Sequence, residues 1–151
     1  PVDSPDLSFG GDTFGADKTI GSNDTYSLSF ETDGTERLQL HSDGRGLSQF
    51  TAKAWCNFDG TGTPALRDSH NCSSITDHGT GEYSVNFTNN LANVNYSASG
   101  LSGDFDNTNG SYDYAFFGNR QFLVGSYRFQ IMNASATARD ANAVCIQFFG
   151  D

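Results

Sequence analysis

The chain has 151 residues, enough for one ordinary domain with a short extension but too few for two complete domains. Aromatic residues make up 13% and charged residues only 17% of the sequence, a composition that argues against disorder. The formal net charge of -10 would repel phosphate groups, and no stretch approaches the roughly 18 apolar residues of a membrane span, so neither nucleic-acid binding nor membrane insertion is expected.

The first fifty residues contain one hairpin signal and few apolar residues to bury. Apolar and polar residues alternate over residues 26–31, an Asp-Gly pair follows, and Leu38 and Leu40 alternate in the returning strand. A lone two-stranded hairpin is marginal in water, so something else must cover its apolar face. Three copies of the chain around a common axis would do so. We therefore predict that residues 1–49 form an extended β segment of a homotrimer.

Residues 50–151 are predicted to form a compact β-sandwich domain. Alternating runs are separated by turns rich in Gly, Asn and Asp, and no window repeats apolar residues at helical spacing for three turns. The expected strands cover residues 50–58, 66–75, 82–88, 94–98, 112–117, 122–132 and 143–149. The predicted fold class is therefore all-β throughout.

Two stretches of the sequence carry a distinctive pattern: LSFETDGTERLQLHSDGRG at residues 28–46, and AKAWCNFDGTGT at 52–63 followed by SHNCSSITDHGTGEYSVNF at 69–87. They resemble the shaft-like hairpin segment and the C-terminal module of bacteriophage tail fibres, especially those of phages of marine bacteria and cyanobacteria. The likeness covers about residues 28–96 and is weaker over 128–149. It implies a trimeric β-structure at the distal tip of a tail fibre in the virion, joined to the rest of the fibre and the tail, with a role in host attachment.

The three cysteines do not follow the pattern of a disulfide framework, because their number is odd and Cys56, Cys72 and Cys145 lie far apart in the sequence. We predict three buried free thiols. The family resemblance implies valine at positions 56 and 72. Because a Val-to-Cys exchange keeps a small buried apolar group, it supports a core role for both thiols.

The run Asp68-Ser69-His70 contains the residue types of a serine hydrolase, in which an imidazole base activates the serine and a carboxylate orients the base. Adjacent residues of a strand point to opposite faces, so these three cannot form a relay among themselves. The sequence also lacks G-x-S-x-G, Walker and H-E-x-x-H motifs. We predict no catalytic residues, no cofactor and no enzymatic activity.

Two groups of potential metal ligands compete with structural roles. His70 and Cys72 would share a strand face, with His78 folding back across a turn, but a fourth zinc ligand and a recognised spacing are lacking. Residues 104–110 supply hard oxygens, but their spacing differs from that of an EF-hand. We predict no metal site, although a histidine on a three-fold axis, which would collect one ligand from each subunit, stays open.

Carbohydrate recognition needs aromatic faces for the C–H surface of a sugar and multidentate polar groups for its hydroxyls. Residues 104–122 combine both kinds, and loops on a rigid scaffold often carry function. The predicted receptor-binding residues are Asp104, Asp106, Tyr112, Tyr114, Asn119 and Arg120. In the competing interpretation, the two tyrosines form the inward face of an ordinary strand. Trp55 is either a packing residue or a sugar platform, and the motif shared with the family favours packing.

The function predicted from the sequence is host attachment by a trimeric fibre tip that binds a glycan, lipopolysaccharide or an outer-membrane protein on a bacterial surface. Three weak sites on one rigid tip would bind by effective concentration. A net charge of -10 per chain would repel lipopolysaccharide, which favours neutral sugars or bridging divalent cations. Two alternatives stay open: a structural trimerisation tip without direct receptor contact, and a polysaccharide-degrading fibre with paired carboxylates.

Overall fold

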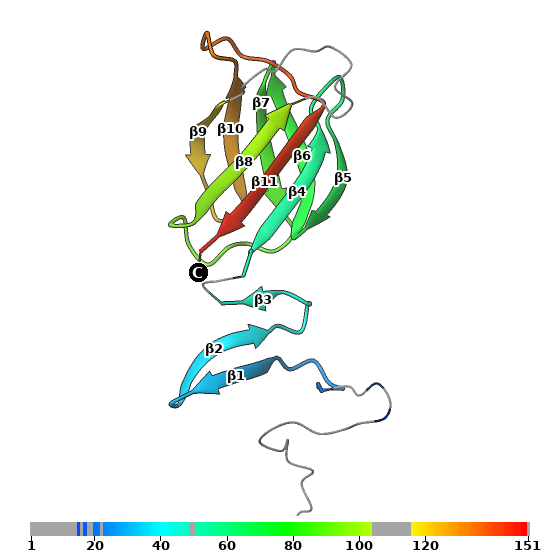
Figure 1. Ribbon diagram of the computed structural model, residues 1–151, viewed down its shortest axis with the longest axis vertical. Helices are drawn as coiled ribbons and strands as arrows, with labels where there is room; N and C mark the ends of the chain where they lie inside the picture. The colour runs from blue at the N-terminus through cyan, green and yellow to red at the C-terminus, as the bar shows by residue number, and fades with distance from the viewer. Residues whose placement is uncertain are drawn as a thin grey trace, which may run out of the picture.

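The computed structural model describes residues 15, 17, 20–21, 23–48, 51–103 and 116–150, and every regular element in this part of the chain is a β-strand (Figure 1). The all-β prediction is confirmed. The strands form one three-stranded sheet and two four-stranded sheets, and neighbouring strands pair antiparallel. No helix that could span a membrane occurs among the described residues.

The N-terminal sheet contains the hairpin that the sequence predicts. β1 (Leu28–Thr32) pairs with β2 (Thr35–Leu40), and β3 (Gly46–Leu47) pairs with the other edge of β2. The connecting residues Asp33 and Gly34 have φ angles of 53° and 63°. A type I′ turn requires positive φ at both central positions, and its twist matches that of the flanking strands.

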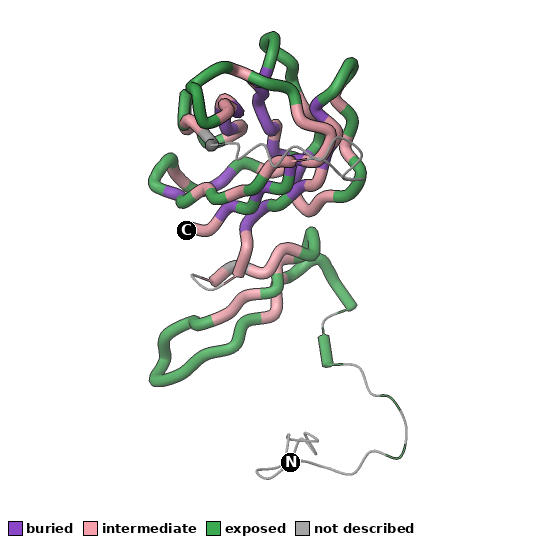
Figure 2. Tube along the Cα trace, turned by 45° about the horizontal axis from the view of Figure 1, so that its top comes forward, coloured by how far each residue is buried: buried purple, intermediate pink, exposed green. Residues whose placement is uncertain are grey.

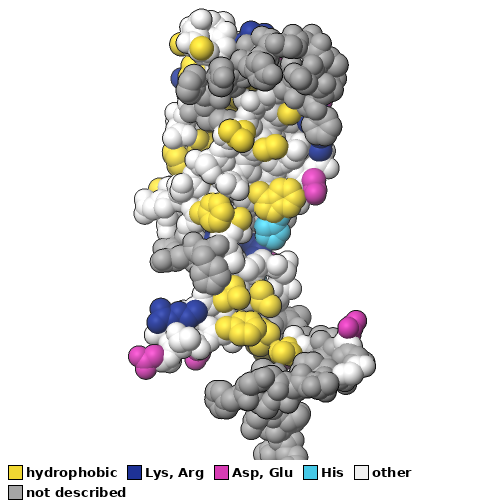
Figure 3. Space-filling view, viewed as in Figure 1, with side chains coloured by type: hydrophobic (Ala, Val, Ile, Leu, Met, Phe, Trp, Pro, Cys, Tyr) yellow, Lys and Arg dark blue, Asp and Glu magenta, His cyan; other side chains and the backbone are white. Residues whose placement is uncertain are grey.

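One face of this hairpin is apolar and exposed. Leu28 pairs with Leu40 and Phe30 with Leu38, so the four side chains share a face. Phe30 is 47% exposed and Leu40 44%, and Tyr26, just before β1, is 77% exposed. Figure 3 shows hydrophobic side chains gathered over this sheet. Within a single chain, the apolar face that the sequence predicts therefore remains accessible to solvent.

The remaining strands form two sheets that pack face to face, so the predicted β-sandwich is confirmed (Figure 1). One sheet has the order β5-β4-β11-β8 and the other the order β6-β7-β10-β9. We call them the β4/β11 sheet and the β7/β10 sheet after their central strands. The strands are β4 (Ala54–Asp59), β5 (Ala65–His70), β6 (Cys72–Gly79), β7 (Glu82–Phe87), β8 (Ser97–Gly103), β9 (Phe116–Phe122), β10 (Ser126–Met132) and β11 (Ala143–Phe149).

The core between these two sheets is built from aromatic rings. Buried residues alternate with more exposed ones along the central strands, and Figure 2 shows the buried positions concentrated between the sheets. The rings of Phe58 and Tyr83 meet edge to face with centroids 5.4 Å apart, and those of Phe87 and Phe148 do so at 5.0 Å. Each fully buried ring contributes roughly 1.5–3 kcal/mol, so few apolar residues suffice for a stable core.

The single strand predicted over residues 66–75 is wrong, because the chain changes sheets at Asn71. This residue alone separates β5 from β6 and has a left-handed φ of 54°, a conformation that asparagine adopts more readily than most residues. The Asn71 amide donates to the carbonyls of Lys53 and Asn89 at 3.0 and 3.1 Å, and it accepts from the Asn89 N–H at 2.8 Å. These hydrogen bonds stabilise the corner between the sheets.

Two other predicted strands differ from the structure, and a third is described only in part. The run predicted as one strand over 122–132 is divided by a turn between β9 and β10. The strand predicted over 94–98 begins later, at Ser97, where β8 starts. The strand expected at 112–117 overlaps only the first two residues of β9, since residues 104–115 lie outside the described part of the chain. Predicted strand boundaries are therefore reliable only where large apolar residues alternate.

The predicted domain boundary falls between residues 49 and 50, which the structure does not describe, so the division into two domains stays a prediction. Lys53, just before β4, is only 5% exposed. Its Nζ donates to the Ser48 carbonyl at 2.5 Å, and its backbone N–H donates to the Phe148 carbonyl at 2.8 Å. The start of β4 is thus bonded both to the preceding segment and to the last strand.

Candidate functional site

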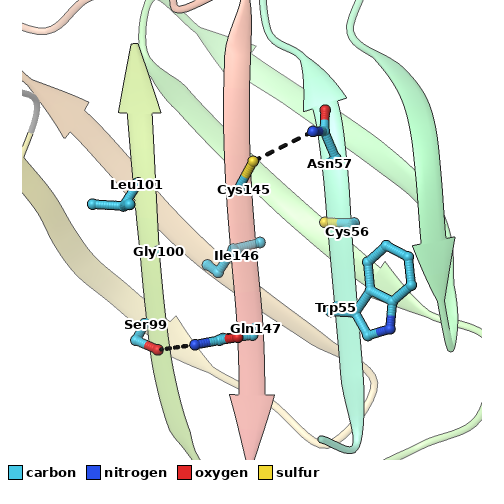
Figure 4. Close-up of a pocket in the computed structure, with 9 residues that line it drawn as sticks. All are labelled: Trp55, Cys56, Asn57, Ser99, Gly100, Leu101, Cys145, Ile146 and Gln147. Atoms are coloured by element: carbon cyan, nitrogen blue, oxygen red, sulfur yellow. Dashed lines mark hydrogen bonds between the residues drawn. The ribbon is translucent and has the colours of Figure 1, made fainter.

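An open hollow of about 560 Å³ lies on the outer face of the β4/β11 sheet (Figure 4). Strands β4, β11 and β8 form it, with β11 in the middle. Its lining residues are Trp55, Cys56, Asn57, Ser99, Gly100, Leu101, Cys145, Ile146 and Gln147. The hollow therefore joins parts of the chain that are far apart in the sequence.

Strand alternation decides which side chains face the hollow. Buried residues alternate with more exposed ones in β4 and β11, so Trp55 and Asn57 point outward from β4, and Cys145 and Gln147 point outward from β11. The pairing register sets Trp55 opposite Gln147 and Asn57 opposite Cys145. The inward neighbours of these residues belong to the aromatic core, which fixes the backbone that carries them.

Two rows of outward-facing side chains cross the three strands, with one residue from each strand in each row. From β4 to β8, the first row is Trp55, Gln147 and Ser99, and the second row is Asn57, Cys145 and Leu101. Gln147 Nε2 donates to Ser99 Oγ at 3.3 Å, and Asn57 Nδ2 donates to Cys145 Sγ at 3.4 Å. These bonds orient both amides across the floor of the hollow, as Figure 4 shows.

The walls of the hollow are apolar. Trp55 is 37% exposed and Leu101 is 79% exposed, and Figure 4 shows them on the two strands that flank β11. The indole of Trp55 lies on the outer face of the sheet and outside the core, so the packing role that the family motif favours would be on this outer face. An exposed tryptophan beside a hollow is also a common element of binding surfaces.

Among the described residues that line the hollow, none is a Lys, Arg, Asp or Glu. On the neighbouring strand β5, His70 pairs with Trp55 and Asp68 with Asn57. Further along, Arg67 Nη2 lies 2.8 Å from Asp59 Oδ2. The Thr61 hydroxyl and backbone N–H donate to Asp59 and hold its pKa below the usual value. The charged side chains beside the hollow in the register and in the sequence are therefore Asp68, the Arg67–Asp59 pair and Lys53, whose Nζ donates to the Ser48 carbonyl.

The prediction of three buried thiols is confirmed for Cys56 and Cys72 and wrong for Cys145, which is exposed. The reason is again alternation, because the large apolar residues of β11 occupy the inward positions and leave Cys145 outside. A hydrogen bond with the Cys72 thiol, together with burial, raises the pKa of Cys56. The Cys145 thiol is thus the accessible one, and it lies in the hollow.

A second, smaller hollow of about 310 Å³ lies on the β7/β10 sheet and is lined by Glu82, Arg120, Gln121 and Arg128. Glu82 Oε1 lies 3.0 Å from Arg128 Nε and 3.6 Å from Arg120 Nε. Arg120 also donates to the side-chain oxygen of Gln130. The two guanidinium groups in this hollow are therefore already engaged with protein acceptors.

Only part of the receptor-binding surface predicted from the sequence is described by the structure. The predicted residues outside the described part are Asp104, Asp106, Tyr112 and Tyr114. Asn119 and Arg120 are neighbours on β9; Asn119 accepts a hydrogen bond from the Tyr127 hydroxyl, and Arg120 lines the second hollow. Neither lines the hollow at Trp55, and their role in binding stays a prediction.

The residues considered for hydrolysis and for zinc are not assembled into sites. Ser69 pairs with a core residue of β4, whereas its neighbours Asp68 and His70 pair with outward-facing ones. The predicted shared face of His70 and Cys72 is wrong, because the corner at Asn71 puts them in different sheets. Among the described residues, no three His, Cys, Asp or Glu side chains gather as metal ligands.

Gln147, Ser99 and Leu101 are not among the site residues predicted from the sequence. A signal exists for Gln147, because the alternation over residues 143–149 assigns it to the outer face. Its contact with β8 and its place opposite Trp55 depend on strand order, which sequence periodicity does not determine. The hollow is therefore a product of the topology.

No protein-family model matches the sequence, and no curated protein matches it. A distant structural neighbour is a phage tailspike. This is the phiAB6 tailspike, solved in complex with three-repeated oligosaccharides of Acinetobacter baumannii surface polysaccharide. The TM-score is 0.50 and the sequence identity 11%, over 91% of this chain and 30% of the tailspike chain. The likeness concerns the fold, and this chain spans less than a third of the tailspike's length.

Proposed function

We propose that this chain is part of a bacteriophage tail protein, carried on the virion, that attaches the particle to a polysaccharide on the surface of the bacterial host. The similarity of the fold to a tailspike solved with bacterial surface oligosaccharides supports this proposal. The resemblance of residues 28–96 to phage tail fibres points the same way. The rest of the fibre and the tail would be the structural partners of the chain.

The observation that carries the proposal is the exposed indole of Trp55 beside a row of uncharged polar side chains. An indole face packs against the C–H surface of a sugar, and amide and hydroxyl groups exchange hydrogen bonds with its hydroxyls. Trp55, Gln147 and Ser99 supply these groups in one row.

We propose attachment without cleavage at this hollow. Glycoside hydrolysis uses two carboxyl groups that flank the scissile bond, roughly 5–10 Å apart. The described lining residues include no carboxylate, and the nearest one in the pairing register is Asp68. A measurement of reducing ends released from the bound polysaccharide tests this part of the proposal, and their steady release would overturn it.

We further propose that the chain is a homotrimer in which three hairpins cover one another. The exposed apolar face formed by Leu28, Phe30, Leu38 and Leu40 supports association through this segment. Self-association also suits weak sugar sites, because three linked sites raise the effective concentration of the second and third contacts. Attachment would then depend on both the hairpin and the hollow.

The proposal is tested by measuring binding of the purified chain to immobilised surface polysaccharides from marine bacteria, cyanobacteria and Acinetobacter baumannii. We expect the wild type to bind at least one of them. Trp55→Ala should weaken that binding by about tenfold, because the lost stacking contact is worth about 1.4 kcal/mol. Leu123→Ala, an exposed apolar position in the turn after β9, is the matched control and should bind as the wild type.

Two outcomes would contradict the assignment in different ways. If Arg120→Ala abolishes binding and Trp55→Ala does not, the receptor surface is the one predicted from the sequence around Arg120. If the chain assembles but binds neither the polysaccharides nor intact cells, the alternative of a structural tip is correct. Both variants alter side chains on outer strand faces, so their folding is expected to be unimpaired.

A further inference from the structure

Resting on the function proposed above, we propose that the hollow at Trp55 selects a neutral pyranose that carries a methyl group, either in an acetamido substituent or as a 6-deoxy carbon. This selectivity rests on the apolar walls of the hollow, on its polar floor and on the distribution of charge around it. Figure 4 labels the side chains of the walls and the floor.

The walls of the hollow favour a ligand with two apolar surfaces. Trp55 and Leu101 belong to strands separated by β11, so their backbones lie two strand spacings, about 10 Å, apart. They also stand in different rows, which sets them diagonally across the floor. A sugar ring packed on the indole would direct a substituent toward Leu101, and only an apolar substituent gains from contact with that exposed side chain.

The floor between these walls supplies uncharged hydrogen-bonding groups. Because Gln147 Nε2 already donates to Ser99 Oγ, the Gln147 carbonyl oxygen and the Ser99 hydroxyl hydrogen remain for a ligand. In the second row, Asn57 Nδ2 donates to Cys145, whose polarisable sulfur packs well against C–H groups. The floor therefore suits hydroxyl and amide groups of a sugar. Its described residues include no guanidinium group, which would bind a carboxylate through two N–H donors.

The charge distribution disfavours acidic sugars. None of the described lining residues is cationic, and the Nζ of Lys53, two residues before Trp55, already donates to the Ser48 carbonyl. Asp68 pairs with Asn57 in the strand register, and the chain as a whole has a net charge of -10. A uronate or sialate carboxylate would enter without a partner and against a negative field. A neutral sugar avoids both costs.

The single tryptophan of the chain allows a direct test, because its fluorescence reports on this hollow alone. The probes are the methyl glycosides of N-acetylglucosamine, rhamnose, glucose and glucuronic acid, titrated into the millimolar range. We expect a saturable change with the first two. Binding of glucose should be about fourfold weaker, the factor that corresponds to one buried methyl group, and glucuronic acid should give no change. N-acetylglucosamine carries the methyl group in an acetamido substituent and rhamnose carries it as the 6-deoxy carbon. The tighter binder of the two therefore identifies the source of the methyl group.

Leu101→Ala is the decisive variant, with Leu123→Ala as its matched control. It should abolish the preference for methyl-bearing sugars over glucose, whereas the control should retain that preference. The inference is overturned if glucose or glucuronic acid binds as well as the methyl-bearing sugars, if no probe changes the fluorescence, or if Leu101→Ala keeps the preference. If one of these results is obtained and Trp55→Ala still loses polysaccharide binding, the proposed attachment function is retained and only the sugar selectivity is rejected.

Discussion

The hydroxyl of Tyr83 lies 2.6 Å from Oδ1 of Asp140, a residue that follows it by 57 positions in the sequence. The same oxygen accepts the Gly81 N–H at 2.7 Å, and the ring of Tyr83 is fully buried in the core. Asp140 thus bonds the segment before β11 to the start of β7. The stability of the sandwich depends on this contact between distant parts of the chain.

Asp140→Ala is expected to lower the free energy of unfolding by about 2 kcal/mol, because it leaves the Gly81 N–H without its acceptor and leaves the buried Tyr83 hydroxyl only the Gly60 carbonyl, 2.8 Å away. Urea denaturation measures the change. Tyr83→Phe removes the hydroxyl instead, and the double variant should cost less than the sum of the two single variants. Strictly additive costs would mean that the hydrogen bond does not stabilise the fold.

Two glycines with similar backbone angles should respond differently to alanine. Gly81 has a φ of 70°, and a Cβ added to it would lie 2.7 Å from both the Arg139 backbone nitrogen and the Ile131 backbone oxygen. Gly62 has a φ of 63°, and a Cβ added to it would have no atom within 4 Å. Gly62→Ala should cost about 1 kcal/mol from the left-handed backbone alone. Gly81→Ala should cost at least about 2 kcal/mol more, because backbone must move. Equal melting temperatures for the two variants would contradict the packing at Gly81.

The sandwich is expected to lose stability in alkali. Burial raises the pKa of Tyr96 to about 12 from an ordinary value of 10, and burial also raises the pKa values of Tyr83 and Tyr127. The folded chain therefore holds these protons more tightly than the unfolded chain does. Their contribution to stability is complete below about pH 10 and falls as the pH rises from 10 toward 12.

Near-ultraviolet absorbance of phenolate, followed together with circular dichroism, checks this pH dependence. Phenolate from the buried tyrosines should appear in the same pH interval as the loss of β-structure. Full ionisation of every tyrosine in a chain that keeps its circular dichroism would contradict the burial of these rings.

The three thiols should react in two classes. Cys145 is exposed, whereas Cys56 and Cys72 are buried, and thiol reactivity requires both access and the thiolate form. Iodoacetamide should therefore add one group to the native chain and three after denaturation, as read by intact mass. Cys145→Ser is the control and should reduce native labelling to zero. A ligand that fills the hollow should slow the labelling of Cys145.

The hairpin face should control the oligomeric state. The double substitution Phe30→Ser and Leu40→Ser removes much of the exposed apolar surface, and light scattering should then report a monomer, whereas the wild type is expected to give a trimer. Glu31→Ser, on β1 but outside the apolar set, should leave the trimer intact. A wild-type chain that stays monomeric at high concentration would contradict the proposed assembly.

Alternation of large apolar residues made much of the fold predictable from the sequence. The strand at 143–149 agrees with β11 because Val144, Ile146 and Phe148 occupy its inward positions. The hairpin at Asp33 and Gly34 is equally clear, since few other residue pairs accept positive φ at both positions.

The strands that sequence periodicity misses lack this signal. β8 reads SASGLSG, and its one large apolar residue, Leu101, points outward. The corner at Asn71 interrupts an apparently continuous run through a single backbone angle. The hollow could not be predicted for a third reason, because Trp55 and Gln147 come together only through the pairing of β4 with β11.

The place of Trp55 on β4 has a mechanical consequence. Lys53, two residues earlier, is bonded to Ser48 on one side and to Phe148 on the other. A pulling force applied between the N-terminal segment and a molecule held on Trp55 would therefore travel through a few residues at the start of one strand. The aromatic core would carry almost none of this load, so the fold could hold its ligand under tension without being stretched.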